Sequence, residues 1–143
     1  MELAEMVKIL GGKQILRMKL RNQLDLIALS RRGVSKLALL NLQKNLSFTS
    51  GEMAKLLPVS ERTIQRYTRQ KRFNAIVSEH ILRIAEVAAK GKVVFEDIGK
   101  FIAWLNQPNI NFENKSPVSF LDSGFGSEMV LNELGRIEHG VYS

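Results

Sequence analysis

Apolar residues recur at spacings of three and four along most of this chain, and runs that alternate between apolar and polar residues are absent. Because that spacing places apolar side chains on one face of an α-helix, the pattern predicts an all-α protein. Leu3, Met6, Val7 and Leu10 form the first such stripe. The pair Gly11-Gly12 follows the stripe and is expected to end the helix.

Two more helices are predicted before residue 47. The first is expected to stop at Gly33, and Ser35 is suited to cap the second. The residues expected to face inward from these two helices are Leu24, Ile27, Ala28, Leu37, Leu40 and Leu46.

The clearest helix start lies at Thr49. Glu52 stands three residues later, which is the spacing of a capping box. The helix that begins there must be short, because Pro58 cannot continue it. Ser60 then has the position and side chain of an N-cap for another helix. Two short helices joined by a tight turn at residues 57–60 form a helix-turn-helix.

Helical spacing continues in the second half of the chain. Ser78 is expected to cap a longer helix that Gly91 closes, and a further helix is predicted over residues 95–106. The dipeptide Ser116-Pro117 fits an N-cap followed by proline at the first helical position. The last helix is predicted over residues 127–138. Its inward residues are expected to be Val130, Leu131, Leu134 and Ile137.

Charge divides the chain into two parts. Residues 1–90 carry 17 Lys and Arg against 7 Asp and Glu, a net charge of +10, whereas residues 91–143 carry 4 against 7, a net charge of −3. A basic front and an acidic back predict two modules with different partners, residues 1–90 and 91–143. The basic module suits nucleic acid or another anionic surface.

Composition excludes several classes of protein. The chain has no cysteine, which rules out disulfides and thiolate metal sites and fits a reducing compartment. No apolar run approaches the roughly 18 residues of a membrane span, and the N-terminus does not look like a secretory signal. We therefore expect a cytoplasmic protein without a membrane partner.

The basic stretch "VSERTIQRYTRQKR" (residues 59–72) decides what the front module does. Wound as one helix from Ser60, it places its cationic side chains on one face and Ile64 and Tyr67 on the other. Arginine can bridge guanine O6 and N7, and glutamine can bridge adenine N6 and N7, so this face suits the major groove. An alternative is a helical hairpin with a solvated basic face. The candidate DNA-binding residues are Ser60, Glu61, Arg62, Thr63, Gln65, Arg66 and Arg69.

Residues about 49–71 resemble the helix-turn-helix of Xre/Cro-like regulators. Ala54 matches the small residue of the first helix and Ile64 matches the branched apolar residue of the second. Pro58 stands where that motif usually has glycine. Glu61 is open to three interpretations: it repels phosphate, accepts a hydrogen bond from cytosine, or stabilises the helix dipole.

A longer resemblance covers nearly the whole chain. The segments "WLNQPN" (104–109), "SPVSFL" (116–121) and "LGRIEHGVYS" (134–143), with Gly126 before the last helix, are similar to the toxin-binding domain of Xre/MbcA/ParS antitoxins. The first half of the chain has three further segments that are similar to the same antitoxins, "ILGG", "RRGVS" and "SERTIQR".

This resemblance implies an antitoxin that neutralises a toxin of the RES family, whose members attack NAD or use it to modify a target. It also implies that the end of the antitoxin blocks the toxin's active-site opening. The expected toxin-binding residues are Gly140, Val141, Tyr142 and Ser143. The antitoxin would bind its own promoter as a homodimer and would be nucleoid-associated when bound to DNA, and the apolar stripes of the first and last helices offer dimer surfaces.

An enzyme is not expected. His80 and His139 are the only histidines, and each has an acidic neighbour that points elsewhere on a helix, so neither forms a catalytic dyad. We expect no cofactor and no metal. The alternative function is a free-standing dimeric helix-turn-helix regulator of transcription without a toxin partner.

Overall fold

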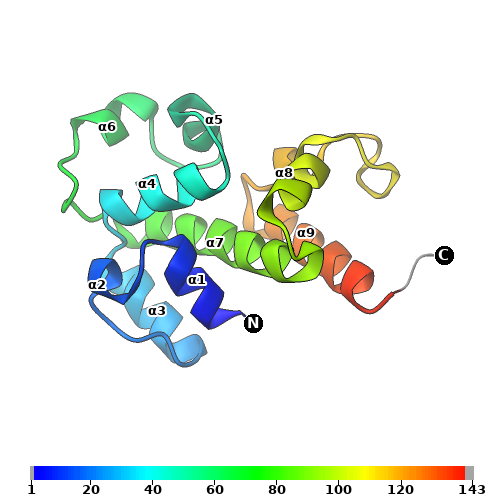
Figure 1. Ribbon diagram of the computed structural model, residues 1–143. Coiled ribbons are helices and arrows are strands. Elements are labelled where there is room, and N and C mark those ends of the chain that lie inside the picture. The colour runs from blue at the N-terminus through cyan, green and yellow to red at the C-terminus, as the bar shows by residue number, and fades with distance from the viewer. Residues whose placement is uncertain (1, 141–143) are drawn as a thin grey trace.

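The computed structural model describes residues 2–140, and within them it contains nine α-helices and two 3₁₀-helices (Figure 1). This range has no strand. Its only β-type pairings are two isolated bridges, Ser35 with Arg72 and Asn109 with Lys115. The all-α prediction is therefore confirmed.

The helices lie in the order that the apolar pattern predicts, with one extra short helix near the start. The first seven are α1 (Leu3–Ile9), α2 (Lys13–Leu16), α3 (Gln23–Arg32), α4 (Lys36–Asn45), α5 (Ser50–Lys55), α6 (Glu61–Arg66) and α7 (Ala75–Phe95). The rest are α8 (Ile98–Asn106), the 3₁₀-helices η1 (Ile110–Phe112) and η2 (Pro117–Phe120), and α9 (Gly124–Glu138).

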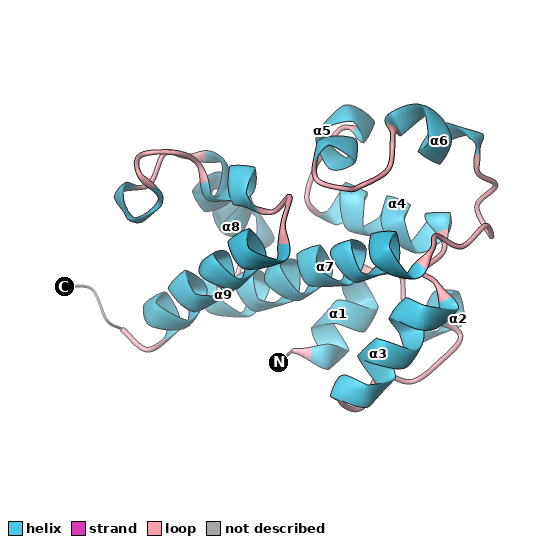
Figure 2. Ribbon diagram, turned by 180° about the vertical axis from the view of Figure 1, so that it is seen from behind, coloured by secondary structure: helices cyan, strands magenta, loops and turns pink. Residues whose placement is uncertain are grey.

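The long helix α7 is the centre of the fold. It contacts α1 and α3 in the first half of the chain and α8 and α9 in the second. Figures 1 and 2 show α6 near one end of α7, and the free end of α9 near the other. Ten of the 21 residues of α7 are buried, so one helix contributes to the core of both modules.

The cap predictions for α4, α5 and α6 are confirmed. Thr49 and Glu52 form the capping box of α5: the Glu52 N–H donates to the Thr49 hydroxyl at 3.0 Å, and the Thr49 N–H donates to the Glu52 carboxylate at 2.8 Å. Ser35 caps α4 and Ser60 caps α6. Pro117 stands at the start of η2, although Ser116 makes no side-chain cap there.

Helix α7 corrects two predictions. Asn74, not Ser78, is its N-cap, and the helix runs through Gly91 to Phe95. Ser78 is fully buried inside the helix, where its hydroxyl accepts the Val34 N–H at 2.8 Å and donates to the Phe73 carbonyl at 3.2 Å. The predicted division at residues 90 and 91 thus falls within one continuous helix.

The face that α3 buries was also predicted wrongly. Leu24 is 73% exposed and Ile27 is 38% exposed, whereas Leu29 is buried. In α4 the buried residues are Ala38, Leu39 and Leu42, and the expected Leu37 and Leu40 are only half-buried. Both helices were predicted correctly from the spacing of their apolar residues. Which face is buried depends on neighbours that are distant in the sequence.

The last helix begins earlier than predicted. Ser123 caps α9, and Gly126 lies in the first turn instead of before the helix. A Cβ on Gly126 would lie 1.8 Å from the Phe120 carbonyl oxygen, so the close contact between η2 and α9 requires glycine at this position. No helix in residues 2–140 combines the length and the apolar character of a membrane span.

Candidate functional sites

Helix α6 is held by its own cap and by α5. The Ser60 hydroxyl accepts the Thr63 N–H at 3.1 Å and donates to the Thr63 hydroxyl at 2.9 Å. Ile64 is buried and anchors the inner face of the helix. Because α5 and α6 contact each other across the turn at residues 56–60, they form the predicted helix-turn-helix.

The outer face of α6 is exposed and cationic. Arg62, Gln65 and Arg66 are all exposed, and Thr63 beside them is half-buried. The Arg66 guanidinium reaches the Thr63 hydroxyl at 3.5 Å, so the two side chains lie together. None of the ion pairs among residues 2–140 uses Arg62 or Arg66. Apart from the Arg66 contact with Thr63, both guanidinium groups therefore keep their donors for a partner.

Arg69 does not lie on this helix, contrary to the sequence prediction. Helix α6 ends at Arg66, and Tyr67 is extended, with its ring stacked on Phe73 at 5.0 Å between centroids. The physical reason is the start of α4, where the Leu37 N–H donates to the Arg69 carbonyl at 2.9 Å. The loop stays extended because its carbonyls accept the otherwise unpaired N–H groups at the start of α4.

The side chain of Arg69 nevertheless remains close to the candidate face. It lines a surface hollow between α4, α5 and α6 together with Lys36, Glu61 and Gln65. The ammonium group of Lys36 donates to the Tyr67 carbonyl at 3.0 Å and so fixes the end of α6 to α4. Lys36 is a residue of this region that the sequence patterns did not indicate.

Glu61 faces α5. Its Oε1 lies 3.7 Å from the position that a Cβ on Gly51 would take, in the first turn of that helix. Acidic groups are stabilising at helix starts, and Glu61 also lies in the first turn of its own helix. Of the three sequence interpretations, this geometry favours a role with the helix dipoles.

The acidic module is built on aromatic packing. Trp104 packs against Phe95, Phe101 and Phe112, with ring centroids 5.8 to 6.3 Å apart. Phe112 continues the cluster to Phe120 at 5.2 Å. These contacts join α7, α8, η1 and η2.

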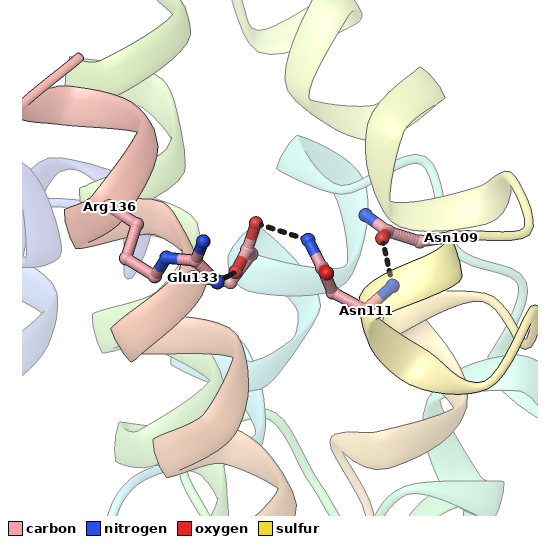
Figure 3. Close-up of polar contacts among 4 residues, drawn as sticks. All are labelled: Asn109, Asn111, Glu133 and Arg136. Carbon is pink, nitrogen blue, oxygen red and sulfur yellow. Dashed lines mark hydrogen bonds and ion pairs between the residues drawn. The ribbon is translucent and has the colours of Figure 1, made fainter. Parts of the chain in front are cut away.

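Polar contacts fix the loop around η1 to α9, as Figure 3 shows. Asn109 caps η1 by accepting the Asn111 N–H at 2.8 Å. The Asn111 amide donates to Glu133 at 3.0 Å, and Arg136 donates to the other Glu133 oxygen at 3.1 Å. The asparagines of the "PNINF" stretch therefore place this loop on the last helix.

The acidic module exposes large apolar side chains. Ile110 on η1 is 81% exposed, and on α9 Phe125 is 92% exposed and Met129 45% exposed. Phe125 and Met129 are four residues apart and share one face of α9. No sequence pattern indicated that these three side chains would be exposed.

The predicted toxin-binding residues are only partly described. Gly140 is exposed, has a φ of 72°, and donates its N–H to the Ile137 carbonyl at 3.1 Å, so it follows the last helix as predicted. Val141, Tyr142 and Ser143 lie outside the described residues. Among the described residues, no group of three or more His, Asp or Glu side chains is arranged to hold a metal ion.

Comparison with known families gives two matches along the chain. Residues 25–86 match the antitoxin Xre-like helix-turn-helix domain, and residues 90–140 match the antitoxin Xre/MbcA/ParS C-terminal toxin-binding domain. An antitoxin Xre from Yersinia enterocolitica is 32% identical over 99 residues, which cover 68% of this chain and 67% of the relative. The chain belongs to the Xre antitoxin family.

A second relative supports the same family. An antitoxin Xre from Photorhabdus laumondii is 30% identical over 99 residues, with the same coverage of both chains. A chain in the crystal structure of the M. tuberculosis MbcT-MbcA toxin-antitoxin complex has a similar fold, with a TM-score of 0.54 and 17% identity. That match covers 86% of the antitoxin described here and all of the other chain.

Proposed function

We propose that this antitoxin neutralises a RES-domain toxin that consumes NAD, by occluding the toxin's active site, and that it binds its own promoter through α6. The observation that supports this most is the pairing, in one chain, of a helix with an unpaired cationic face and a toxin-binding domain. A free-standing regulator would have no need of the second domain. The bound state would place the antitoxin on the nucleoid within the cytoplasm.

The toxin contact is proposed to have two parts. Gly140 to Ser143 would reach the active-site opening, where Tyr142 offers rigid amphipathic area. The exposed side chains of Ile110, Phe125 and Met129 would supply the docking area, because aromatic residues and methionine are enriched in protein interfaces. The match of residues 90–140 with a toxin-binding domain supports placing the contact on this module.

The DNA contact is proposed for the outer face of α6. Arg62, Gln65 and Arg66 would enter the major groove, and Ser60 and Thr63 would contact phosphates or bases near the helix start. Arg69 would act from the adjoining loop and not from the helix itself. Glu61 would hold the start of α5 in place rather than contact DNA.

A homodimer would read two half-sites about one helical turn (~34 Å) apart. The dimer surfaces first considered are occupied within the chain, since Met6 and Leu10 near α1 and Val130 and Leu134 on α9 are buried in the core. The homodimer must therefore use other residues.

Binding to the operon's own promoter tests the DNA assignment. Arg66→Ala is expected to cost on the order of 1–3 kcal/mol of specific binding, because Arg66 would read a base. Lys100 is an exposed residue of α8. Lys100→Gln therefore removes the same charge elsewhere and serves as the control. The measurement is a gel-shift titration, and its stoichiometry also reports whether two chains bind. Equal affinity of the Arg66→Ala variant and the wild type would exclude α6 as the reading helix.

A further inference from the structure

A second cationic surface lies beside the helix-turn-helix. Arg17, Arg32, Arg69 and Arg72 come from three separate segments and line one surface pocket. Gln14 and Gln70 line it as well, and none of the residues around it is acidic. The sequence patterns did not bring these arginines together, because they are up to 55 positions apart.

Backbone contacts hold this arginine cluster in place. The Arg32 guanidinium donates to the Arg17 carbonyl at 3.1 Å, where Arg17 has a left-handed φ of 56° at the end of α2. Arg72 lies against Gly33, since a Cβ on that glycine would be 3.0 Å from the Arg72 Cβ. Gly33 itself has a φ of 101°, so glycine both ends α3 and leaves room for Arg72.

The four arginines have no acidic partner. None of them takes part in an ion pair within residues 2–140, although that range contains seven such pairs. Like charges gathered without a counter-charge repel one another, at a cost to folding. Guanidinium groups bind phosphate through two parallel hydrogen bonds, so a polyanion would offset that repulsion.

The position of the arginine cluster beside α6 indicates that the polyanion is DNA. Arg69 lines both this pocket and the hollow that holds Gln65 at the face of α6. In Figures 1 and 2 the loop after α6 runs along the edge of the molecule on the side where α2 lies. The two hollows that share Arg69 are therefore neighbours on the surface. A DNA duplex whose major groove receives α6 would extend its backbone along that edge.

We propose that Arg17, Arg32 and Arg72 form a phosphate-backbone clamp for DNA flanking the bases that α6 reads. This inference rests on the proposed promoter binding. Backbone contacts add affinity without sequence preference, because phosphates are the same in every duplex. Each phosphate contact also releases counterions, which makes binding depend on salt.

The test uses the full-length Arg17→Gln/Arg72→Gln variant, which keeps Arg32 and its hydrogen bond to the Arg17 carbonyl. Affinity for the promoter duplex and for an unrelated duplex of equal length should fall by the same factor, on the order of 10-fold. The slope of log affinity against log salt should become shallower by roughly 2. Lys100→Gln/Lys115→Gln is the control of equal charge change, and fluorescence anisotropy over a salt series provides the measurement.

The outcomes separate this inference from the promoter assignment. If Arg66→Ala loses promoter preference while Arg17→Gln/Arg72→Gln binds both duplexes with the wild-type salt slope, the clamp is wrong and the role of α6 stands. An equal change in the Lys100→Gln/Lys115→Gln variant would also overturn the clamp, because net charge alone would explain it. A parallel titration with ATP separates a free nucleotide from DNA: if the wild type binds ATP and the Arg17→Gln/Arg72→Gln variant does not, with duplex binding unchanged, the clamp is wrong and the arginines serve a nucleotide site. A melting temperature equal to that of the wild type confirms that the variant folds.

Discussion

Gly91 has a role in packing that its neighbours in the sequence do not indicate. Glycine after an apolar stripe predicts a helix end, yet Gly91 lies buried within α7. A Cβ at this position would lie 2.2 Å from the Phe101 ring. The glycine therefore allows α8 to approach α7 closely.

Alanine at position 91 is expected to destabilise the fold by about 1–3 kcal/mol, because the fully buried Phe101 ring has no room to move. Gly135→Ala is the matched control, since Gly135 is also inside a helix and a Cβ there meets nothing within 4 Å. That control is expected to gain roughly 0.5–1 kcal/mol from helix propensity. Urea denaturation measures both, and a stabilised Gly91→Ala variant would contradict the packing account.

At the residue scale, the sequence predicts what is local. Thr49, Glu52 and Ser60 were identifiable as caps because their partners lie three residues away. Ser78 was mistaken for a cap because its partner Val34 is 44 residues distant. Arg69 was misplaced for a similar reason, since its carbonyl accepts a hydrogen bond from an N–H group on α4.

Among the elements, α7 is fastened to both termini of the described chain by ion pairs. Lys90 contacts Glu2 before α1 at 3.7 Å and also pairs with Glu138 at the end of α9. Lys92 pairs with Glu5 of α1 at 3.1 Å. The hydrogen bond from Lys92 lowers the pKa of Glu5, and the hydrogen bond from Lys90 lowers the pKa of Glu138.

These pairs predict how stability depends on pH. A carboxylate with a lowered pKa stabilises the fold fully above its ordinary value of 4.5, and that contribution disappears as the pH falls through the lowered pKa. Lys90→Met should therefore lower the melting temperature at pH 7, and its difference from the wild type should shrink below about pH 4. Lys100→Met should give a small difference that is constant with pH. A Lys90→Met difference that is equally large at pH 3 and pH 7 would count against the ion pairs.

The elements themselves were largely predictable, because helical periodicity and caps are properties of short stretches. What the pattern left undetermined was the buried face of α3, where Leu24 is exposed and Leu29 is buried. That choice is made by α7, which packs against α3 from more than 40 residues away. The same dependence on tertiary partners kept Phe125 and Met129 from being recognised as surface residues.

The whole molecule separates the cationic face of α6 from the C-terminal end of α9, which leads to the residues proposed to occlude the toxin. The cationic face of α6 lies near one end of α7, and the free end of α9 lies near the other (Figure 1). The change in charge between residues 1–90 and 91–143 follows the same division. If each contact depends only on its own end, damage to one should leave the other intact.

The most direct measurement is the NAD content of cells that express a RES-domain protein from the same operon together with the antitoxin at matched levels. The full chain and Arg62→Ala/Arg66→Ala should preserve NAD equally, because α6 takes no part in the toxin contact. Deletion of Val141 to Ser143 should preserve NAD less well, because those residues would occlude the active site. A full chain that fails to preserve NAD would contradict the proposed neutralisation, and a truncated chain that preserves it fully would contradict occlusion by the last residues.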